Sequence, residues 1–304
     1  DPDTHDTLRV VAIDGASIIT GGPVVLASGS IVSLDASGGL LWSPAASYQS
    51  LALGETATEQ FRYRIADGNG GFAEADAFLR IEGRNDAPVA RPDTASAGED
   101  GPPVAIGVLM NDDDVDGDDD ATTLRVVAAQ ATSGASVIIG TGNVLSYSAA
   151  GHWDRLGANE TGTDSVTYTV EDRHGARSTG LVTVAVTGKN DAPTAVPDML
   201  MIGAETVLRL PGPAIMANDT DPDLHDIKRI VAINGSGDSV GKTITLASGA
   251  LLTVEADGNL TYDPNGRFSG LQPFQRATDS FTYTIVDGSG APSTAAVTIE
   301  IQGT

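Results

Sequence analysis

The residues best suited to chemistry are aspartates gathered in short loops. Residues 111–120 read NDDDVDGDDD and hold seven aspartates in ten positions, and residues 218–223 (NDTDPD) and 1–3 (DPD) repeat part of that pattern. Aspartates at alternate positions let several short carboxylates converge on one hard cation that takes about six to eight oxygen ligands. The pattern therefore predicts calcium sites built from Asp1, Asp3, Asn111, Asp112, Asp114, Asp116, Asn218, Asp219, Asp221 and Asp223.

The charge of the whole chain agrees with a bound cation. Asp and Glu number 41, Lys and Arg number 17, and the net charge is −24. Such an excess of carboxylate repels itself unless something neutralises it. A solvated acidic loop that aids solubility is the alternative interpretation, but the recurrence of the loop at equivalent places favours calcium. An EF-hand is excluded, because Thr123 stands where the loop that begins at Asp112 would need Glu, and the flanks look like strands.

Further acidic residues recur in three other places. The first place precedes the segment in each copy where apolar and polar residues alternate most clearly. The second place is the linker NDAP, which could instead form a plain turn without a metal. The last place lies upstream of the aspartate loops. These places add the candidate ligands Glu55, Glu59, Glu160, Asp164, Asp279, Asn85, Asp86, Asn190, Asp191, Glu99, Asp100 and Glu205, while Gln275 replaces an acid in the third copy. We interpret Asp67, Asp172 and Asp287, which precede glycine-containing turns, as turn residues.

The chain is an array of repeats. NDAP occurs at 85–88 and 190–193, and QFRYRIADGNG (60–70) returns as SVTYTVEDRHG (165–175) and SFTYTIVDGSG (280–290). We expect domains at residues 1–85, 86–190 and 191–304, of which the first lacks about 28 opening residues and the second lacks about 11 residues before Tyr147. A sandwich domain without its first strands leaves an unpaired edge.

Each repeat alternates with period two. Phe281, Tyr283 and Ile285 fall on one face of a strand while Thr282 and Thr284 fall on the other. Turn signals such as DGNG and DPNG separate such segments, and no convincing amphipathic helix is found. We expect an all-β chain of tandem Greek-key β-sandwich domains, immunoglobulin- or cadherin-like, joined by short calcium-binding linkers. The aromatic residues recur in register, so we assign them to the core: Trp42 with Tyr147 and Tyr262, and Trp153 with Tyr48 and Phe268.

Composition excludes several functions. Seventeen basic residues against 41 acidic ones exclude an electrostatic nucleic-acid binder. The absence of cysteine excludes disulfides, thiolate catalysis and cysteine-ligated zinc. No apolar run is long enough to span a membrane, and residues 1–11 do not read as a signal peptide. The sequence contains no HExxH, GxSxG or phosphate-binding glycine loop, so we expect no enzyme.

The joint pattern resembles the tandem cadherin-like repeats, or VCBS-type repeats, of large bacterial RTX-type adhesins and surface proteins. The residues that carry the resemblance are NDAP, Glu99–Asp100, the loops at 111–116 and 218–223, and the segments 160–172 and 278–288. The resemblance implies calcium-rigidified extender repeats, secretion by a type I system, an extracellular or cell-surface location, and a role in adhesion or biofilm.

The arrangement of the acids suggests a junction, in which the linker, the end of one sandwich and the aspartate loop of the next share cations. Each junction would then be rigid with calcium and flexible without it. The expected partners are calcium ions and neighbouring repeats of the same chain. A calcium-dependent polysaccharide-binding module is the alternative function, and it would need exposed aromatic residues beside polar groups.

Overall fold

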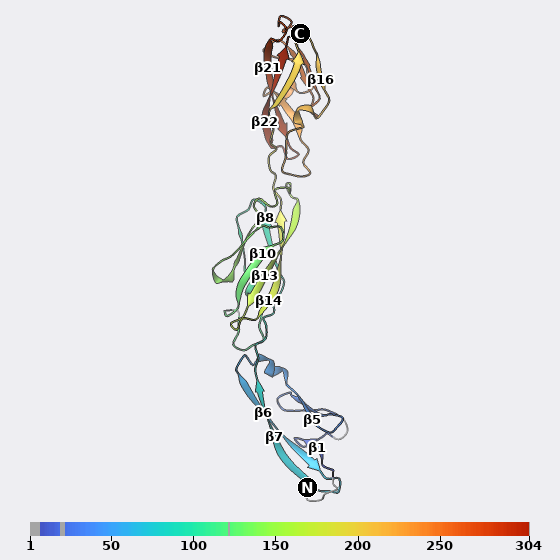
Figure 1. Cartoon of the computed structure of the whole chain (residues 1–304), viewed down its shortest axis with the longest axis vertical. Coiled ribbons are helices and arrows are strands. Elements are labelled where there is room, and N and C mark those ends of the chain that lie inside the picture. Colours follow the sequence, from blue (N-terminus) through green and yellow to red (C-terminus); the bar gives the residue numbers. More distant parts are fainter. Residues whose placement is uncertain (1–6, 19–21, 121, 304) are drawn as a thin grey trace.

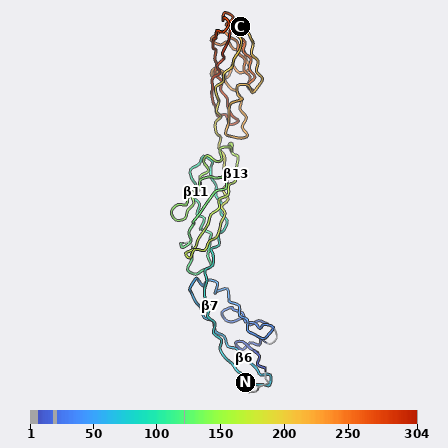
Figure 2. The backbone as a smooth tube through the Cα atoms, viewed as in Figure 1, coloured from blue at the N-terminus to red at the C-terminus, as the bar shows by residue number. Residues whose placement is uncertain are grey.

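The computed structural model describes residues 7–18, 22–120 and 122–303. Three β-sandwich domains follow one another along the long axis, with the two termini at opposite ends (Figures 1 and 2). Among the described residues there is no α-helix, and the helical segments are short 3₁₀ turns at Ala46–Ser50, Val108–Met110, Thr141–Asn143, Ala214–Met216 and Gly237–Ser239. A search of the same residues for a helix that is long and apolar enough to cross a membrane finds none.

The described residues of the middle domain, 86–120 and 122–190, form seven strands in two sheets. One sheet has the order β10-β13-β14-β8 and the other has the order β11-β12-β9. The opening strand β8 runs parallel to β14, whereas the other pairings are antiparallel. This is the Greek-key sandwich that the alternating pattern predicts. The strands are β8 (Asp93–Gly98), β9 (Val104–Ile106), β10 (Arg125–Ala131), β11 (Ser136–Ile139), β12 (Leu145–Ser148), β13 (Thr161–Glu171) and β14 (Arg177–Thr187).

The third domain repeats this topology with one additional strand. Its sheets have the orders β15-β22-β21-β17 and β16-β20-β19-β18. The short strand β18 has no counterpart in the described part of the middle domain, which agrees with the missing residues before Tyr147. The strands are β15 (Asp198–Gly203), β16 (Leu208–Leu210), β17 (Arg229–Ile233), β18 (Ile244–Thr245), β19 (Leu251–Val254), β20 (Leu260–Asp263), β21 (Arg276–Val286) and β22 (Pro292–Gln302).

Among residues 7–18 and 22–84, the first domain has the same two layers, without counterparts of β8 and β9. Its sheets have the orders β2-β1-β6-β7 and β3-β4-β5, so β7 and β5 are edge strands. The strands are β1 (Arg9–Ile13), β2 (Ala16–Ser17), β3 (Val24–Val25), β4 (Ile31–Leu34), β5 (Leu40–Ser43), β6 (Thr56–Ala66) and β7 (Phe72–Glu82).

Each domain has its own hydrophobic core between its two sheets. Tyr147 and Tyr262 are 0% exposed and Trp153 is 6% exposed, so these three aromatic residues are core residues, as predicted. Trp42 is only half-buried, because it lies on β5, an edge strand among the described residues of the first domain. Its indole Nε1 donates a hydrogen bond to Glu59 Oε2 at 3.2 Å.

The ring of Trp153 packs directly against Gly162 of β13, where a larger residue would not fit. A Cβ atom on Gly162 would lie 2.3 Å from Cζ3 of Trp153, which is closer than van der Waals contact allows. The other repeats have a smaller ring with an alanine at the two equivalent positions, Tyr48 with Ala57 and Phe268 with Ala277. The larger ring and the missing methyl group therefore compensate for each other within the core.

We expect Gly162→Ala to destabilise the middle domain by about 1–3 kcal/mol, because the added methyl group overpacks the core against Trp153. Trp153→Phe should rescue most of that loss in the double variant, because it restores the pairing seen in the third domain. Urea unfolding followed by circular dichroism, at fixed calcium, measures both free energies. If Gly162→Ala lowers the free energy of unfolding equally in the natural chain and in the Trp153→Phe variant, the two positions are not coupled.

Candidate metal centres at the domain junctions

The second linker is held against the aspartate loop of the third domain. Asn190 Nδ2 donates to Asp287 Oδ2 at 2.8 Å, and the backbone N–H of Asp191 donates to Asp223 Oδ2 at 3.0 Å. One backbone bond crosses the junction, from the N–H of Leu224 to the carbonyl of Arg155, at 3.1 Å. The loop, the linker and the end of the preceding domain are therefore joined at one place.

Several buried oxygen atoms at this junction have no hydrogen-bond partner. Oxygens of Asp221, Asp226 and Asp287 lie within 4.8 Å of one another. Asp223 is 3% exposed, and while one of its oxygens accepts the linker amide, the other is unpartnered. Buried polar atoms in folded proteins are normally paired, so unpartnered oxygens that converge need a donor or a cation. The unpartnered atoms are Asn190 Oδ1, Asp221 Oδ2, Asp223 Oδ1 and Asp226 Oδ2.

The middle domain contributes acids to the same junction. Glu99 follows β8 and is 1% exposed; one of its oxygens accepts the backbone N–H of Lys189, and the other is unpartnered. Burial raises the pKa of Glu99 above its usual range, and the charges of Asp191, Asp100 and Asp223 add to that shift. Glu160 lies 2.9 Å from His225 Nδ1 of the third domain, measured from Oε1. Acids of both domains thus meet at the linker.

Repulsion dominates the electrostatics of the junction. Burial raises the pKa of both Asp221 and Asp223, and neighbouring carboxylates raise it further. Burial also raises the pKa of Asp191, to which the charge of Asp100 contributes. The folded chain therefore disfavours the ionised form of these groups, and a cation placed among them would reverse that preference.

The first junction repeats the same contacts. Asn85 Nδ2 donates to Asp172 Oδ2 at 2.8 Å, the N–H of Asp86 donates to Asp116 Oδ2 at 2.8 Å, and the N–H of Gly117 donates to the carbonyl of Ser50 at 2.9 Å. Its two metal-compatible groups are Asp114 with Asp119 and Asp172, and Asp118 with Asp119 and His174. The unpartnered buried oxygens are Asn85 Oδ1, Asp114 Oδ2, Asp116 Oδ1, Asp118 Oδ1 and Asp119 Oδ2.

The described part of the first domain contributes fewer acidic residues to the first junction than the middle domain contributes to the second junction. Glu55, the counterpart of Glu160, is exposed and its Oε2 accepts the N–H of Ala52 at 3.1 Å. The repeat position of Glu99 falls before residue 1 in this domain. Asp1 and Asp3 lie outside the described residues.

Three predicted ligands lie between the sheets of their own domains instead of at a junction. Asp164 accepts the hydroxyl of Tyr147 at 2.8 Å, and burial together with this bond raises the pKa of Tyr147 to about 12. Asp279 accepts the hydroxyl of Tyr262, also at 2.8 Å. Glu59 accepts Ser30 Oγ at 2.5 Å and the indole of Trp42. Hydroxyl and indole donors satisfy these acids, so we leave Glu59, Asp164 and Asp279 out of the metal centres.

The first two residues of each aspartate loop have another structural task. Asp112 Oδ1 accepts the N–H of Arg91 at 2.8 Å and the hydroxyl of Tyr168 at 3.0 Å. Asp219 Oδ1 makes the same bonds to Val196 N, at 2.8 Å, and to the hydroxyl of Tyr283, at 2.9 Å. These aspartates fasten the chain after the linker to a core strand. The adjacent Asn111 and Asn218 donate to the carbonyls of Pro92 and Val196.

The remaining predicted ligands differ in position. Asp100 is exposed and lies 3.2 Å from Lys189 Nζ, so it stays near the second junction. Glu205 is exposed and follows β15, at the end of the third domain away from the linker. That end carries Ala204 where the middle domain has Glu99, and Gln275 where it has Glu160, so it lacks the acids that face the second linker.

The sequence interpretation missed six residues of the two clusters. Asp172 and Asp287 do form turns, since Asp172 Oδ1 accepts the N–H groups of His174 and Ala176, but the second oxygen of each carboxylate faces the linker asparagine. The interpretation as turn residues alone was therefore incomplete. A shared spacing could have revealed Asp119 and Asp226, because each follows the last aspartate of its loop motif by three residues. The other two missed residues are Asp118 and His174.

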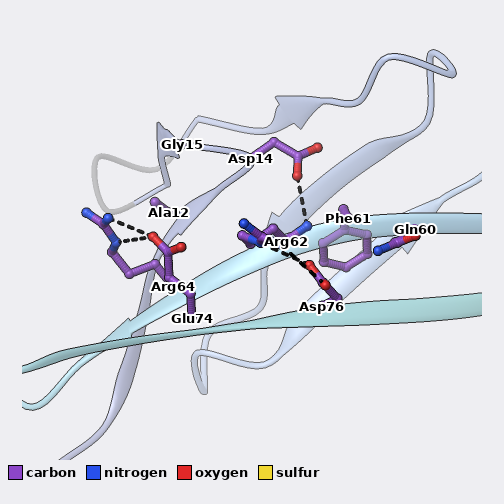
Figure 3. A pocket seen from close by; sticks show the side chains of 9 residues that line it. All are labelled: Ala12, Asp14, Gly15, Gln60, Phe61, Arg62, Arg64, Glu74 and Asp76. Atoms are coloured by element: carbon purple, nitrogen blue, oxygen red, sulfur yellow. Dashed lines mark hydrogen bonds and ion pairs between the residues drawn. The ribbon is translucent and has the colours of Figure 1, made fainter.

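A shallow depression on the first domain offers no comparable site. Its lining includes two ion pairs on neighbouring strands, Arg62 with Asp76 at 3.0 Å and Arg64 with Glu74 at 2.6 Å (Figure 3). Phe61 is its aromatic residue and is 4% exposed, because it belongs to the core. Its arginines pair with Asp76 and Glu74, Asp14 accepts the backbone N–H of Arg62, and no exposed ring lines it, so it does not support the alternative of polysaccharide binding.

The family comparison agrees with the topology. The family model of the bacterial cadherin-like domain matches residues 85–188 and again residues 190–303. The chain belongs to the bacterial cadherin-like domain family. No curated protein matches the chain.

Solved cadherin structures align with the chain at low sequence identity. Mouse cadherin-23 EC22–24 is 14% identical, with the whole chain aligned to 89% of that structure and a TM-score of 0.45. Drosophila N-cadherin EC1–4 is 15% identical, with the whole chain aligned to 68% of that structure and a TM-score of 0.39. The human desmocollin-1 ectodomain is 10% identical with a TM-score of 0.42, and the chain, fully aligned, spans 56% of that structure.

Replacing Glu99 by Gln should have opposite effects with and without divalent cation. Because the pKa of Glu99 is raised in the folded state, its protonation favours folding, and this contribution is lost as the pH rises through the raised pKa. In EGTA at pH 7, Glu99→Gln should therefore raise the melting midpoint of the chain, and the gain should shrink toward pH 4. Adding calcium should raise the melting midpoint of the variant less than it raises that of the natural chain. Scanning calorimetry across this pH range, with and without calcium, measures both effects; a variant that melts lower than the natural chain in EGTA at pH 7 contradicts the argument.

Proposed function

We propose that the chain is a set of calcium-binding extender repeats of an extracellular bacterial adhesin, with domains at residues 1–85, 86–190 and 191–304. Calcium bound at the junctions would hold neighbouring domains in a fixed orientation, and the rigid array would support cell adhesion or biofilm. The observation that carries the proposal is the set of unpartnered buried carboxylate oxygens around each linker. The proposal assigns no catalytic activity to the chain.

The donor set fits calcium in particular. The second junction presents carboxylate and amide oxygens from Asn190, Asp221, Asp223 and Glu99, and its acids belong to two domains. Hard oxygen donors, with several carboxylates and no thiolate, suit calcium better than softer metals. Calcium would supply the positive charge that these acids lack, and it would connect the two domains through the linker.

The expected affinity suits an extracellular location. Extracellular calcium modules bind at about 10⁻⁴–10⁻³ M. A site filled at ten times its dissociation constant stabilises the folded state by about 1.4 kcal/mol. Two junctions with more than one ion each would add a few kcal/mol at millimolar calcium, which is a large share of the stability of an ordinary domain.

Calcium should raise the melting midpoint of the chain well above its value in EGTA, whereas magnesium should raise it little, because magnesium sheds its water reluctantly. Asp223→Asn should reduce the calcium-dependent rise, because it removes charge at the second junction only. Asp116→Asn should act at the first junction, and the double variant should lose most of the rise. Differential scanning fluorimetry measures these shifts.

Asp238→Asn is the matched control for this series, because Asp238 is an exposed acid of the third domain in the short turn Gly237–Ser239. It should leave the calcium-dependent rise unchanged. The proposal fails if the natural chain shows no calcium-specific rise, or if Asp223→Asn behaves as Asp238→Asn does.

Calcium should also narrow the range of orientations between the second and third domains. The chain contains no cysteine, so Thr183→Cys and Ala296→Cys, both at exposed strand positions, accept a pair of spin labels specifically. We expect a broad distance distribution in EGTA and a narrow one in calcium by pulsed electron resonance, and Asp223→Asn should keep it broad.

Labels at Thr245→Cys and Ala296→Cys, both exposed and both within the third domain, provide the control. Their distance distribution should stay the same with and without calcium. If the distance distribution between labels at positions 183 and 296 is equally broad in EGTA and in calcium, calcium does not set the orientation of these domains.

A further inference from the structure

Of the two metal-compatible groups among the described residues of the first junction, one contains a nitrogen donor. Ligand atoms of Asp118, Asp119 and His174 lie within 4.8 Å of one another, and all three residues belong to the middle domain. The His174 Nε2 atom lies 3.0 Å from Asp118 Oδ2. The other group, Asp114 with Asp119 and Asp172, offers carboxylate oxygens only. The two groups therefore suit different kinds of ion.

Two turns bring the side chains of the mixed group together. The N–H of Asp119 donates to the carbonyl of Asp116 at 3.1 Å, which folds the aspartate loop back on itself. Asp172 Oδ1 accepts the N–H of His174 at 2.8 Å and so shapes the turn between β13 and β14. The N–H of Arg173 in that turn donates to Asp119 Oδ1 at 3.4 Å. These bonds place His174 beside the two aspartates of the loop.

Two buried carboxylate oxygens of the mixed group have no hydrogen-bond partner. Asp119 is 8% exposed and its side chain is 0% exposed, yet its Oδ2 atom is unpartnered. Asp118 Oδ1 is buried without a partner as well. Buried polar oxygens are normally paired with a donor or a cation. The bond from His174 reaches only Asp118 Oδ2, so a simple histidine–aspartate ion pair leaves both of these oxygens unexplained.

The arginine beside the group contacts the other oxygen of each aspartate. Arg173 Nη1 lies 3.4 Å from Asp118 Oδ2, and Arg173 Nε lies 3.6 Å from Asp119 Oδ1. Both distances are longer than the roughly 2.7–3.2 Å of a good N–H···O hydrogen bond. The Arg173 side chain is 44% exposed, so it has room to turn toward solvent when an ion binds to the aspartates.

The third domain provides an internal comparison, because its equivalent loop and turn carry different donors. By the repeat spacing, Ser289 stands at the position of His174, and His225 stands at the position of Asp118. The His225 ring lies 2.9 Å from Glu160 of the middle domain instead. The nitrogen donor thus distinguishes the first junction from the second. Among residues 191–303, the metal-compatible group consists of acids only: Asp221, Asp226 and Asp287.

We propose that Asp118, Asp119 and His174 form a binding site for a divalent transition metal of the zinc type, distinct from the all-oxygen groups. Imidazole suits zinc and related metals, whereas calcium takes oxygen ligands. Two carboxylates and one imidazole supply three of the four ligands of tetrahedral zinc, and water would supply the fourth. Because Asp119 also belongs to the all-oxygen group of the first junction, zinc would act on the first junction and not on the second.

Nuclear magnetic resonance of the histidine rings tests the site in the full chain. The sequence contains four histidines, so their ring nitrogen signals can be assigned one by one from single variants. An equimolar amount of zinc, added in calcium-free buffer, should shift the signals of His174 and leave the others little changed. Millimolar calcium should not produce this shift, because calcium binds oxygen ligands. An equal response of several histidines to zinc would mean adventitious binding and would overturn the proposal.

Calorimetric titration with zinc measures the effect of removing the nitrogen donor. His174→Ser, which copies the third domain, should weaken zinc binding at least about tenfold, since even the loss of a residue behind a metal ligand weakens binding about 10- to 100-fold. His152→Ser is the matched control, because His152 is an exposed histidine of the same domain, and it should leave the affinity unchanged. Circular dichroism checks that both variants fold. Equal zinc affinity of His174→Ser and the natural chain contradicts the proposal.

The same donor set can be built into the third domain. Ser289→His combined with His225→Asp reproduces it around Asp226, and the double variant should bind two zinc ions per chain where the natural chain binds one. An unchanged stoichiometry would show that these three residues do not define the site. The titrations contain no calcium, and His174 belongs to neither all-oxygen group. Failure of zinc binding therefore leaves the calcium proposal standing, and failure of calcium binding leaves the zinc result unaffected.

Discussion

At each junction, one carboxylate both accepts a hydrogen bond from the linker and faces the cluster of acidic side chains. One oxygen of Asp116, and one oxygen of Asp223, accepts the backbone N–H of a linker aspartate, and the other oxygen is buried without a partner. The bond to the linker fixes where the unpartnered oxygen lies. A cation bound to this oxygen would therefore also hold the linker, and in this way the proposed calcium would couple ion binding to the orientation of the two domains.

The chain uses buried acids in two chemically different ways. Inside the sandwiches, acids such as Asp164 and Asp112 meet tyrosine hydroxyl donors, so their burial is balanced by hydrogen bonds. At the junctions, acids such as Asp221 and Asp226 meet mainly other acids, and oxygens remain without donors. A count of aspartates alone cannot separate the two, because the decisive difference is which donor the fold places opposite each carboxylate.

This difference explains what the sequence could and could not predict. The alternation of residues such as Phe281 and Tyr283 with threonine depends only on local spacing, so it predicted the sandwich and its core. Glu59 and Asp279 recur with the same repeat spacing as the acids near the linkers. The serine, tryptophan and tyrosine donors that satisfy them lie 17 to 29 residues away in the sequence, so no local pattern shows that they face these acids. Asp287 makes an ordinary turn with one oxygen, so its contact with Asn190, 97 residues away, leaves no local signal.

Among the described residues, the two junctions differ in the acids that the preceding domain contributes. Glu99 follows directly after β8, and its backbone N–H bonds to Thr187 at the end of β14, so closing the sandwich also delivers a buried acid to the next linker. The first domain has neither the strand nor that acid among its described residues, and its junction faces the exposed Glu55. The third domain has the strand, but Ala204 follows it in place of Glu99. The strand that closes the sheet edge and the residue that follows it are thus set independently. A repeat can therefore be complete as a sandwich and still lack the buried acid at the end that faces away from its own linker.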